Sequence, residues 1–187
     1  SWVAAYANDE PAQGFRPLSA GQQAAVKQAL QLWSDVANVK FVQVADTAAQ
    51  VGDLRFGMSS VATTAHSYLP GAFPEAGDVW LSPGVFANAS FAPGTYAFQT
   101  LLHEVGHALG LKHPHEAEGA FPASVKDWLG STVMSYRSFV GDDPYSSGYT
   151  NDFYPTTPML EDIQALQYLY GANYATRSGD NVYRWGN

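Results

Sequence analysis

The sequence predicts an α+β fold, because two long segments have helical periodicity and several short segments between them favour strands. Apolar residues recur at helical spacing after Gln22 and again after Thr95. Four short segments favour strands, since their apolar residues alternate or cluster between turn-forming residues; they are residues 39–44, 53–56, 65–69 and 78–81. We expect one mixed sheet with an antiparallel edge strand, packed with a long N-terminal helix and a second, central helix.

The first helix is expected from Gln22 to Val36, where apolar residues lie three and four apart. Ser19 is the expected N-cap, with Gln22 as its capping-box partner. Residues 65–69 are expected to form the edge strand, because Pro70 and Gly71 close the segment.

The second half of the chain has little periodicity between Lys112 and Thr157, where Gly, Pro, Ser and Asp cluster. This composition predicts a loop-rich region. A last helix is expected to begin at Thr157-Pro158 and to end at Gly171, with the acidic residues Glu161 and Asp162 in its first turns.

Composition limits the classes of function. The chain has 187 residues, 46% hydrophobic and 14% charged, which suits one globular domain with two lobes around a cleft. Its net charge of −8 argues against nucleic-acid binding. Without cysteine there is no disulfide and no thiolate ligand. No apolar run is long enough to cross a bilayer, and the first residues lack the layout of a signal peptide.

Residues His103 to His113 have the spacing His-Glu-x-x-His-x-x-Gly-x-x-His. Residues four apart share a helix face, so His103 and His107 can bind one metal ion side by side. Gly110 can adopt a left-handed conformation that ends the helix and returns His113 as a third ligand. Three histidines and a water form an open, catalytic zinc site rather than a closed, structural one. The pattern predicts one catalytic zinc ion and indicates a zinc peptidase.

Chance is a poor explanation of this pattern. At ordinary residue frequencies it would arise in roughly one chain of this size in 10⁵. The flanking residues also suit a helix, because Thr95 can act as its N-cap and an apolar stripe follows. Glu104, one residue after the first histidine, would reach a water on the metal and act as the general base for attack on a peptide carbonyl.

A second pattern, Ser131 to Tyr136, places Met134 in a tight turn. A methionine there is ordinarily a core residue, but after an elongated zinc motif it indicates a Met-turn beneath the metal. Together the two patterns resemble the metzincin clan. Pro114 after the third histidine and the Met-Ser-Tyr turn are similar to serralysins, which are secreted bacterial metalloproteases. Matrix metalloproteinases would have Met-Tyr-Pro, and astacins would have Glu after that histidine.

The resemblance to serralysins extends from Ser19 to the end of the chain. It includes further landmarks: Ser19–Gln22, Asp53–Gly57, Tyr68–Gly71, Gly77–Leu81, Pro158–Gln167 and Leu169–Asn173. The chain departs after Pro114, where serralysins continue with Gly-Asp-Tyr and this sequence has His115-Glu116-Ala117.

The resemblance implies a metzincin-like zinc peptidase domain with a twisted mixed sheet, an active-site helix and a loop-rich lower lobe that contains the Met-turn and the C-terminal helix. A single catalytic domain, 1–187, would divide into an upper lobe of about 1–110 and a lower lobe of about 111–187. The resemblance also implies that Tyr136 binds the resting zinc and then turns to the oxyanion of the tetrahedral intermediate. The resemblance therefore implies that the protein is a secreted, extracellular bacterial endopeptidase.

An extended substrate is expected to add as a strand to the edge formed by Ala65, His66, Ser67, Tyr68 and Leu69. Protein or peptide substrates are the expected partners, a protein inhibitor is a further candidate partner, and a monomer is expected, with neither nucleic acid nor membrane. Residues 176–187 resemble the junction to a calcium-binding repeat module, although no such repeat is present.

Several alternatives stay open at this point. The chain can be a non-catalytic metal-containing binding protein, although Glu104 is retained, or a matrixin-like or astacin-like endopeptidase. His115 and His66 are expected not to bind the metal. Acidic residues such as Glu116 and Asp142 are candidate ligands of a calcium ion, but their spacing matches no calcium-binding loop.

Overall fold

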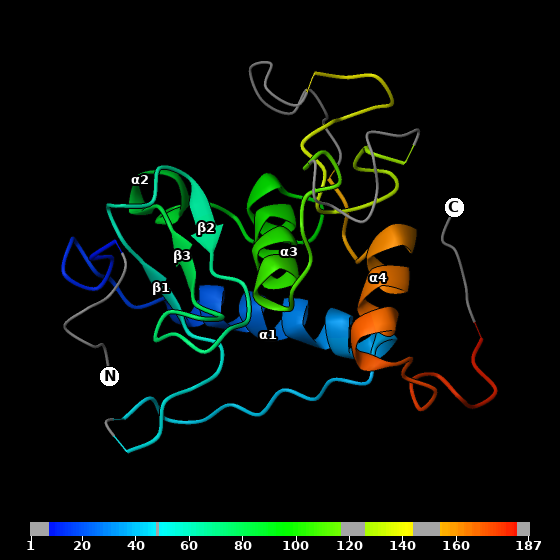
Figure 1. Cartoon of the computed structure of the whole chain (residues 1–187), viewed down its shortest axis with the longest axis horizontal. Helices are drawn as coiled ribbons and strands as arrows, with labels where there is room; N and C mark the ends of the chain where they lie inside the picture. The colour runs from blue at the N-terminus through cyan, green and yellow to red at the C-terminus, as the bar shows by residue number, and fades with distance from the viewer. Residues whose placement is uncertain (1–7, 48, 117–125, 144–153, 183–187) are drawn as a thin grey trace.

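The computed structural model describes residues 8–47, 49–116, 126–143 and 154–182 (Figure 1). Two long helices and a small sheet appear in the order that the sequence predicts, which confirms the α+β class. The elements are α1 (Ala20–Val36), β1 (Phe56–Met58), β2 (Ala65–Ser67), β3 (Val79–Leu81), α2 (Pro83–Phe86), α3 (Tyr96–Ala108) and α4 (Leu160–Tyr170).

The sheet is mixed, with the strand order β1-β3-β2. β3 is the central strand and is fully buried, as expected for a strand covered on both faces. β1 pairs with it in parallel and β2 pairs with it antiparallel, so that His66 lies opposite Trp80. The prediction of an antiparallel edge strand within residues 65–69 is therefore confirmed, over Ala65–Ser67.

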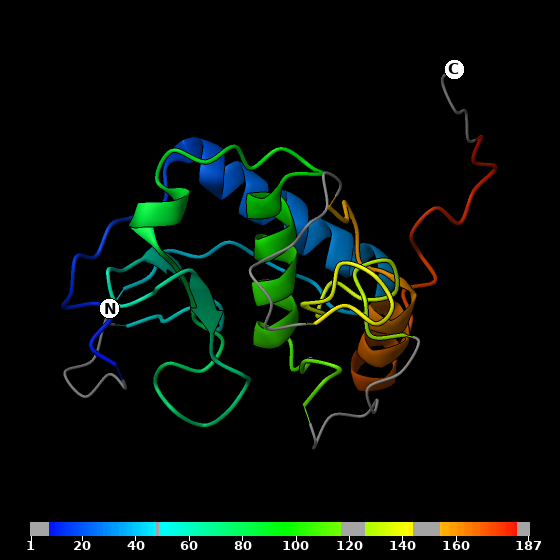
Figure 2. The ribbon, with the colours of Figure 1, turned by 90° about the horizontal axis from the view of Figure 1, so that it is seen from above.

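Helix α3 stands between the sheet and α4, and α1 runs across its base (Figures 1 and 2). The core lies where these elements meet. Trp33 of α1 and Phe98, Leu101 and Leu102 of α3 are all fully buried there. Because α3 is buried along most of its length, any side chain that it carries into the interior is held by packing on several sides.

The helix ends follow their local sequence. The Ser19 side chain accepts a hydrogen bond from the Gln22 amide, and the Gln22 side chain accepts one from the Ser19 amide, which confirms the capping box. Thr95 caps α3 by accepting from the Phe98 amide. Gly171 ends α4 with a φ of 81°.

Several predicted segments need correction, and the first is helix α1, which begins at Ala20 rather than at Gln22. Residues 39–44 form no strand: Val42 and Val44 are exposed, and the outer edge of β1, where a further strand would pair, is bonded at Met58 to Arg16. β1 begins at Phe56, where the predicted strand 53–56 ends. Helix α4 begins at Leu160 rather than at Thr157-Pro158, since the Met159 amide is capped by Asp162.

Within the described part of the chain, no helix combines the length and the apolar content needed to cross a bilayer.

Candidate active site

Helix α3 places two imidazoles side by side at its C-terminal end. His103 and His107 are one turn apart, and their ring centroids are 4.7 Å apart. The helix then ends in a Schellman turn, in which the Gly110 amide donates to the His107 carbonyl and the Leu111 amide donates to the Gly106 carbonyl. Gly110 has a φ of 102°, which confirms the predicted left-handed end of the helix. The turn brings His113 back toward the helix.

The Nε2 atoms of the three imidazoles converge. Nε2 of His113 lies 3.1 Å from Nε2 of His103 and 2.9 Å from Nε2 of His107. Each Nδ1 atom instead donates outward: His103 to the Val133 carbonyl at 2.8 Å, His107 to the Leu111 carbonyl at 2.8 Å, and His113 to the Glu116 carboxylate at 2.7 Å.

This pattern fixes the tautomers. A carbonyl or carboxylate oxygen only accepts, so in each neutral imidazole Nδ1 carries the hydrogen and Nε2 carries the lone pair. The lone pair of His113 then lies about 3 Å from those of both His103 and His107, and these lone pairs repel one another unless a cation lies between them. His103, His107 and His113 can together hold a metal ion, and three neutral nitrogen donors suit zinc.

Burial keeps the helical pair neutral. The pKa of His103 lies well below its usual value because the ring is buried and then because His107 and His113 are adjacent. Burial first, and His113 second, lower the pKa of His107 to about 4. A neutral imidazole is the form that binds metals, so at neutral pH neither ring must lose a proton first.

Glu104 lies on the next helical position and is buried, with 5% of its surface exposed. Burial raises the pKa of this carboxyl to about 7, while a hydrogen bond from the Ser67 hydroxyl lowers it. A nearby cation would further favour the ionised form. A carboxyl poised near neutrality can both take up and release a proton, which is the requirement for a general base.

Met134 packs against α3 at Gly106. Its side chain is buried, and the Val133 carbonyl beside it accepts hydrogen bonds from Nδ1 of His103 and from Gln99 of the same helix. Asp162 at the start of α4 holds the turn by accepting from the Thr132 hydroxyl at 2.5 Å and the Val133 amide at 2.9 Å. The turn therefore connects α4 to the imidazole of His103.

Tyr136 lies beside the imidazoles. Its ring stacks on His103 with centroids 5.4 Å apart, and it lies 4.5 Å from the ring of His113. A little more than one third of the tyrosine surface is exposed to solvent. His115 stacks on His113 with ring centroids 5.0 Å apart, but it is not among the converging histidines.

The predicted substrate strand has two different faces. Ser67 points toward α3 and Glu104, whereas His66 and Tyr68 bind the buried carboxylate of Glu10 at 2.8 Å and 2.6 Å. Ala65 is half-buried beside the core and Leu69 is exposed beyond the strand. His66 is not among the three converging histidines.

Three contacts of the site were not predicted from the sequence. Ser67 bonds the carboxylate of Glu104, Glu116 orients His113, and Gly106 makes room for Met134. Only Gly106 had a local signal, since a glycine inside a helix costs stability and usually has a packing reason. The sequence suggested Glu116 only as a candidate calcium ligand, whereas its carboxylate accepts a hydrogen bond from Nδ1 of His113.

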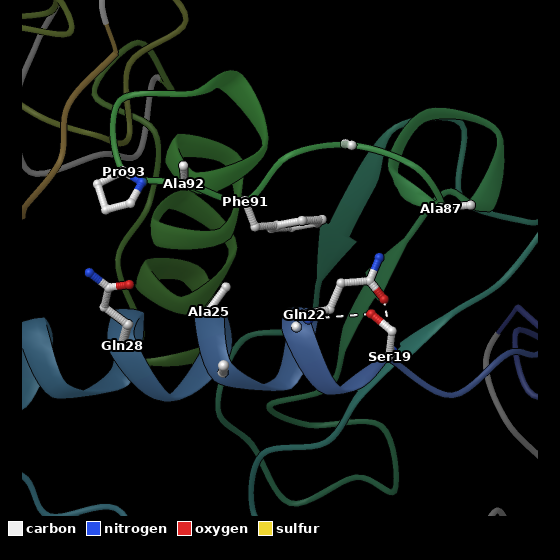
Figure 3. Close-up of a pocket in the computed structure, with 11 residues that line it drawn as sticks. Ser19, Gln22, Ala25, Gln28, Ala87, Phe91, Ala92 and Pro93 are labelled. Atoms are coloured by element: carbon white, nitrogen blue, oxygen red, sulfur yellow. Dashed lines mark hydrogen bonds between the residues drawn. The ribbon is translucent and has the colours of Figure 1, made fainter.

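A cavity of about 360 Å³ lies elsewhere, between α1 and the segment that precedes α3 (Figure 3). Gln22, Gln28 and Phe91 line it together with alanines, and none of its lining residues is titratable. It therefore offers no group for acid–base or metal chemistry, unlike the histidine cluster.

The chain matches a family model described as matrixin, peptidase M10, over residues 16–127. This region contains the three histidines and Glu104 but ends before Met134. The family model therefore covers the histidine pattern but not the turn around Met134, whose sequence differs between the subfamilies.

Curated relatives extend the similarity over most of the chain. Serralysin A of Dickeya chrysanthemi is 39% identical over 183 residues, which cover 91% of this chain and 37% of the relative. Metalloprotease AprA of Pseudomonas entomophila (strain L48) is 38% identical over 184 residues, covering 90% and 37%. Serralysin of Proteus mirabilis is 37% identical over 186 residues, covering 87% and 37%.

The chain thus spans little more than a third of the length of these relatives. The residues that the family model matches include all three converging histidines. The chain therefore belongs to the peptidase M10 (matrixin) family and is similar to serralysins over about nine tenths of its length.

Proposed function

We propose that this protein is a zinc-dependent endopeptidase in which His103, His107 and His113 hold the metal and Glu104 is the general base. The convergence of three Nε2 atoms, each with its Nδ1 hydrogen already donated outward, is the observation that carries the proposal. A zinc ion held there would lower the pKa of a bound water toward neutrality and polarise a substrate carbonyl.

The residues of the chain supply the remaining chemistry. Glu104 takes a proton from the attacking water at its carboxylate and returns that proton to the leaving amine. Burial supports this role, because it raises the pKa of the carboxyl and so makes its carboxylate a better proton acceptor. Tyr136, beside His103 and His113, is proposed as a zinc ligand at rest and as a hydroxyl donor to the oxyanion during the reaction.

Substrate binding is proposed at the edge strand. Among the residues that the structure describes, β2 pairs with β3 and with no other strand, so its other edge can pair with an extended peptide. Residues 65–69 would then set the direction of the peptide across the three histidines. Met134 is proposed to support the metal site from below, because it packs against the helix that carries two of the ligands.

Further properties are proposed from the resemblance to serralysins. The protein is secreted, acts as a monomer on protein substrates, and is open to inhibition by a protein that occupies the same edge. A single catalytic domain with an upper and a lower lobe that meet near residue 110 is part of the same proposal.

The test compares wild type with Glu104→Ala on casein, with zinc measured on the same samples. Loss of the base while the metal stays should abolish nearly all hydrolysis and leave the zinc content unchanged. Hydrolysis at a tenth of the wild-type rate or more, which is a loss of about 1.4 kcal/mol or less, would show that Glu104 is not the base.

A further inference from the structure

The hydroxyl of Ser67 joins the edge strand to the proposed general base. Ser67 Oγ lies 2.7 Å from Oε2 of Glu104 and 2.9 Å from the main-chain oxygen of the same residue. The two residues are 37 positions apart in sequence and belong to β2 and α3. Such a long-range contact depends on the packing of both elements.

The direction of Ser67 follows from strand alternation. Neighbouring side chains of a strand point to opposite faces, and His66 is bound to Glu10. Ser67 therefore points to the other face, toward α3, and its main chain lies opposite the buried Val79 of β3. Register and packing leave the hydroxyl little freedom to turn away.

A buried carboxylate needs hydrogen-bond donors, and the side chain of a glutamate has three torsions that must be fixed before it can act in one geometry. The Ser67 hydroxyl bonds one oxygen of Glu104 and so restricts these torsions. Catalysis by a general base depends on its placement relative to the proton that it removes.

We propose that Ser67 is a positioning residue that holds the carboxylate of Glu104 in register with the peptide bound at the edge strand. This inference rests on the proposed peptidase function. The same residue contributes its main chain to β2 and its hydroxyl to the base. If β2 shifts together with the bound peptide, the Ser67 hydroxyl makes Glu104 shift with them. The placement of the base relative to the peptide is therefore preserved.

Ser67→Ala removes the hydroxyl with little change in volume. We expect kcat to fall on the order of tenfold, the effect of losing one hydrogen bond to a charged group, with KM changed by less than about twofold. Zinc content should not change. Ser67→Thr keeps a hydroxyl on a residue that suits strands and should recover most of kcat.

Ser59→Ala is the matched control. Ser59 is also buried and donates its hydroxyl to a main-chain oxygen, that of Gln13 at 2.9 Å, but this bond lies away from Glu104. The control should lose stability and keep kcat. Equal losses of kcat in Ser59→Ala and Ser67→Ala would overturn the inference. If Ser67→Ala fails to fold, Ser67→Cys, whose thiol is a weaker donor, replaces it, with a fall in kcat expected.

A second measurement needs no catalysis. In the metal-free protein, Ser67→Ala should lower the urea midpoint of unfolding more in the wild-type background than in the Glu104→Ala background, because the carboxylate is then already absent. Additive shifts would overturn the contact on which the inference depends. If the chain hydrolyses no peptide while the shifts are non-additive, the proposed function fails, and the contact between Ser67 and Glu104 stands as structural.

Discussion

Met134 occupies the space that a Cβ atom on Gly106 would need: that atom would lie 2.5 Å from Sδ of Met134. Gly106 is one position before His107, on the side of α3 that faces Met134. The absence of a side chain at Gly106 therefore allows the turn to pack against the helix at the level of the histidines. Gly106, at a variable position of the histidine pattern, thus sets how closely the turn with Met134 approaches the helix that carries His103 and His107.

Gly106→Ala should destabilise the protein. The added methyl must displace a buried methionine, and overpacking of this kind costs about 1–3 kcal/mol, more than the helix propensity gained from alanine. Urea unfolding of the metal-free protein measures the change. Gly21→Ala on α1 is the control, because a Cβ there meets nothing within 4 Å, and it should be neutral or stabilising. A stable Gly106→Ala variant would mean that Met134 moves aside freely.

Glu116→Ala should weaken metal binding without removing a ligand. The carboxylate accepts from Nδ1 of His113 at 2.7 Å and so orients that ring. Loss of such a partner reduces metal affinity by about ten- to hundredfold. A titration against a chromophoric chelator measures it. Asp35→Ala, which removes a carboxylate bonded to Gln31 on α1, is the control. Equal zinc affinity in the Glu116 variant and in wild type would contradict the role of Glu116.

Tyr136→Phe should lower kcat by about tenfold to a thousandfold, the usual effect of losing one donor to the transition state. KM should change little, because the edge strand and side-chain pockets bind the substrate. Zinc should stay bound to the three imidazoles. Steady-state kinetics on a peptide, with zinc measured on the same sample, checks this. An unchanged kcat would leave Tyr136 as a packing residue against His103.

Glu10 makes stability depend on pH. Burial alone would raise the pKa of this carboxyl, but hydrogen bonds from Tyr68, its own main chain and His66 together lower it below its ordinary value of 4.5. The folded form then binds its proton less readily than the unfolded form. The stabilisation is present above about pH 4.5 and is lost as the pH falls through the folded pKa.

The difference in urea midpoint between wild type and Glu10→Gln should therefore shrink from pH 6 to pH 3. A difference that is constant with pH would mean that the carboxylate of Glu10 is not stabilised by Tyr68 and His66.

The parts of the fold that were predictable depend on local signals. Neighbouring residues alone determine the capping box of Ser19 and Gln22, the cap at Thr95 and the left-handed conformation of Gly110. The prediction of a strand at residues 39–44 was wrong, because a strand also needs a neighbouring strand with which it can form hydrogen bonds. Alternation in the sequence does not reveal that Arg16 already bonds the edge at Met58.

The site was predictable to the same extent. The spacing of His103, His107 and His113 follows from helix geometry and one turn, so the sequence placed them together. Ser67 was read only as part of the edge strand, since its contact with Glu104 joins two elements far apart in sequence. The contact between Glu116 and His113 depends on the conformation of the chain after His113, and the sequence has no periodic signal there.

The number of zinc ions per chain in wild type and in His107→Ala tests the account most directly. Elemental analysis of the two purified proteins should find about one zinc per wild-type chain and almost none in the variant, because two imidazoles hold the ion poorly where three converge. Undiminished zinc in His107→Ala would contradict the claim that His103, His107 and His113 form the metal site.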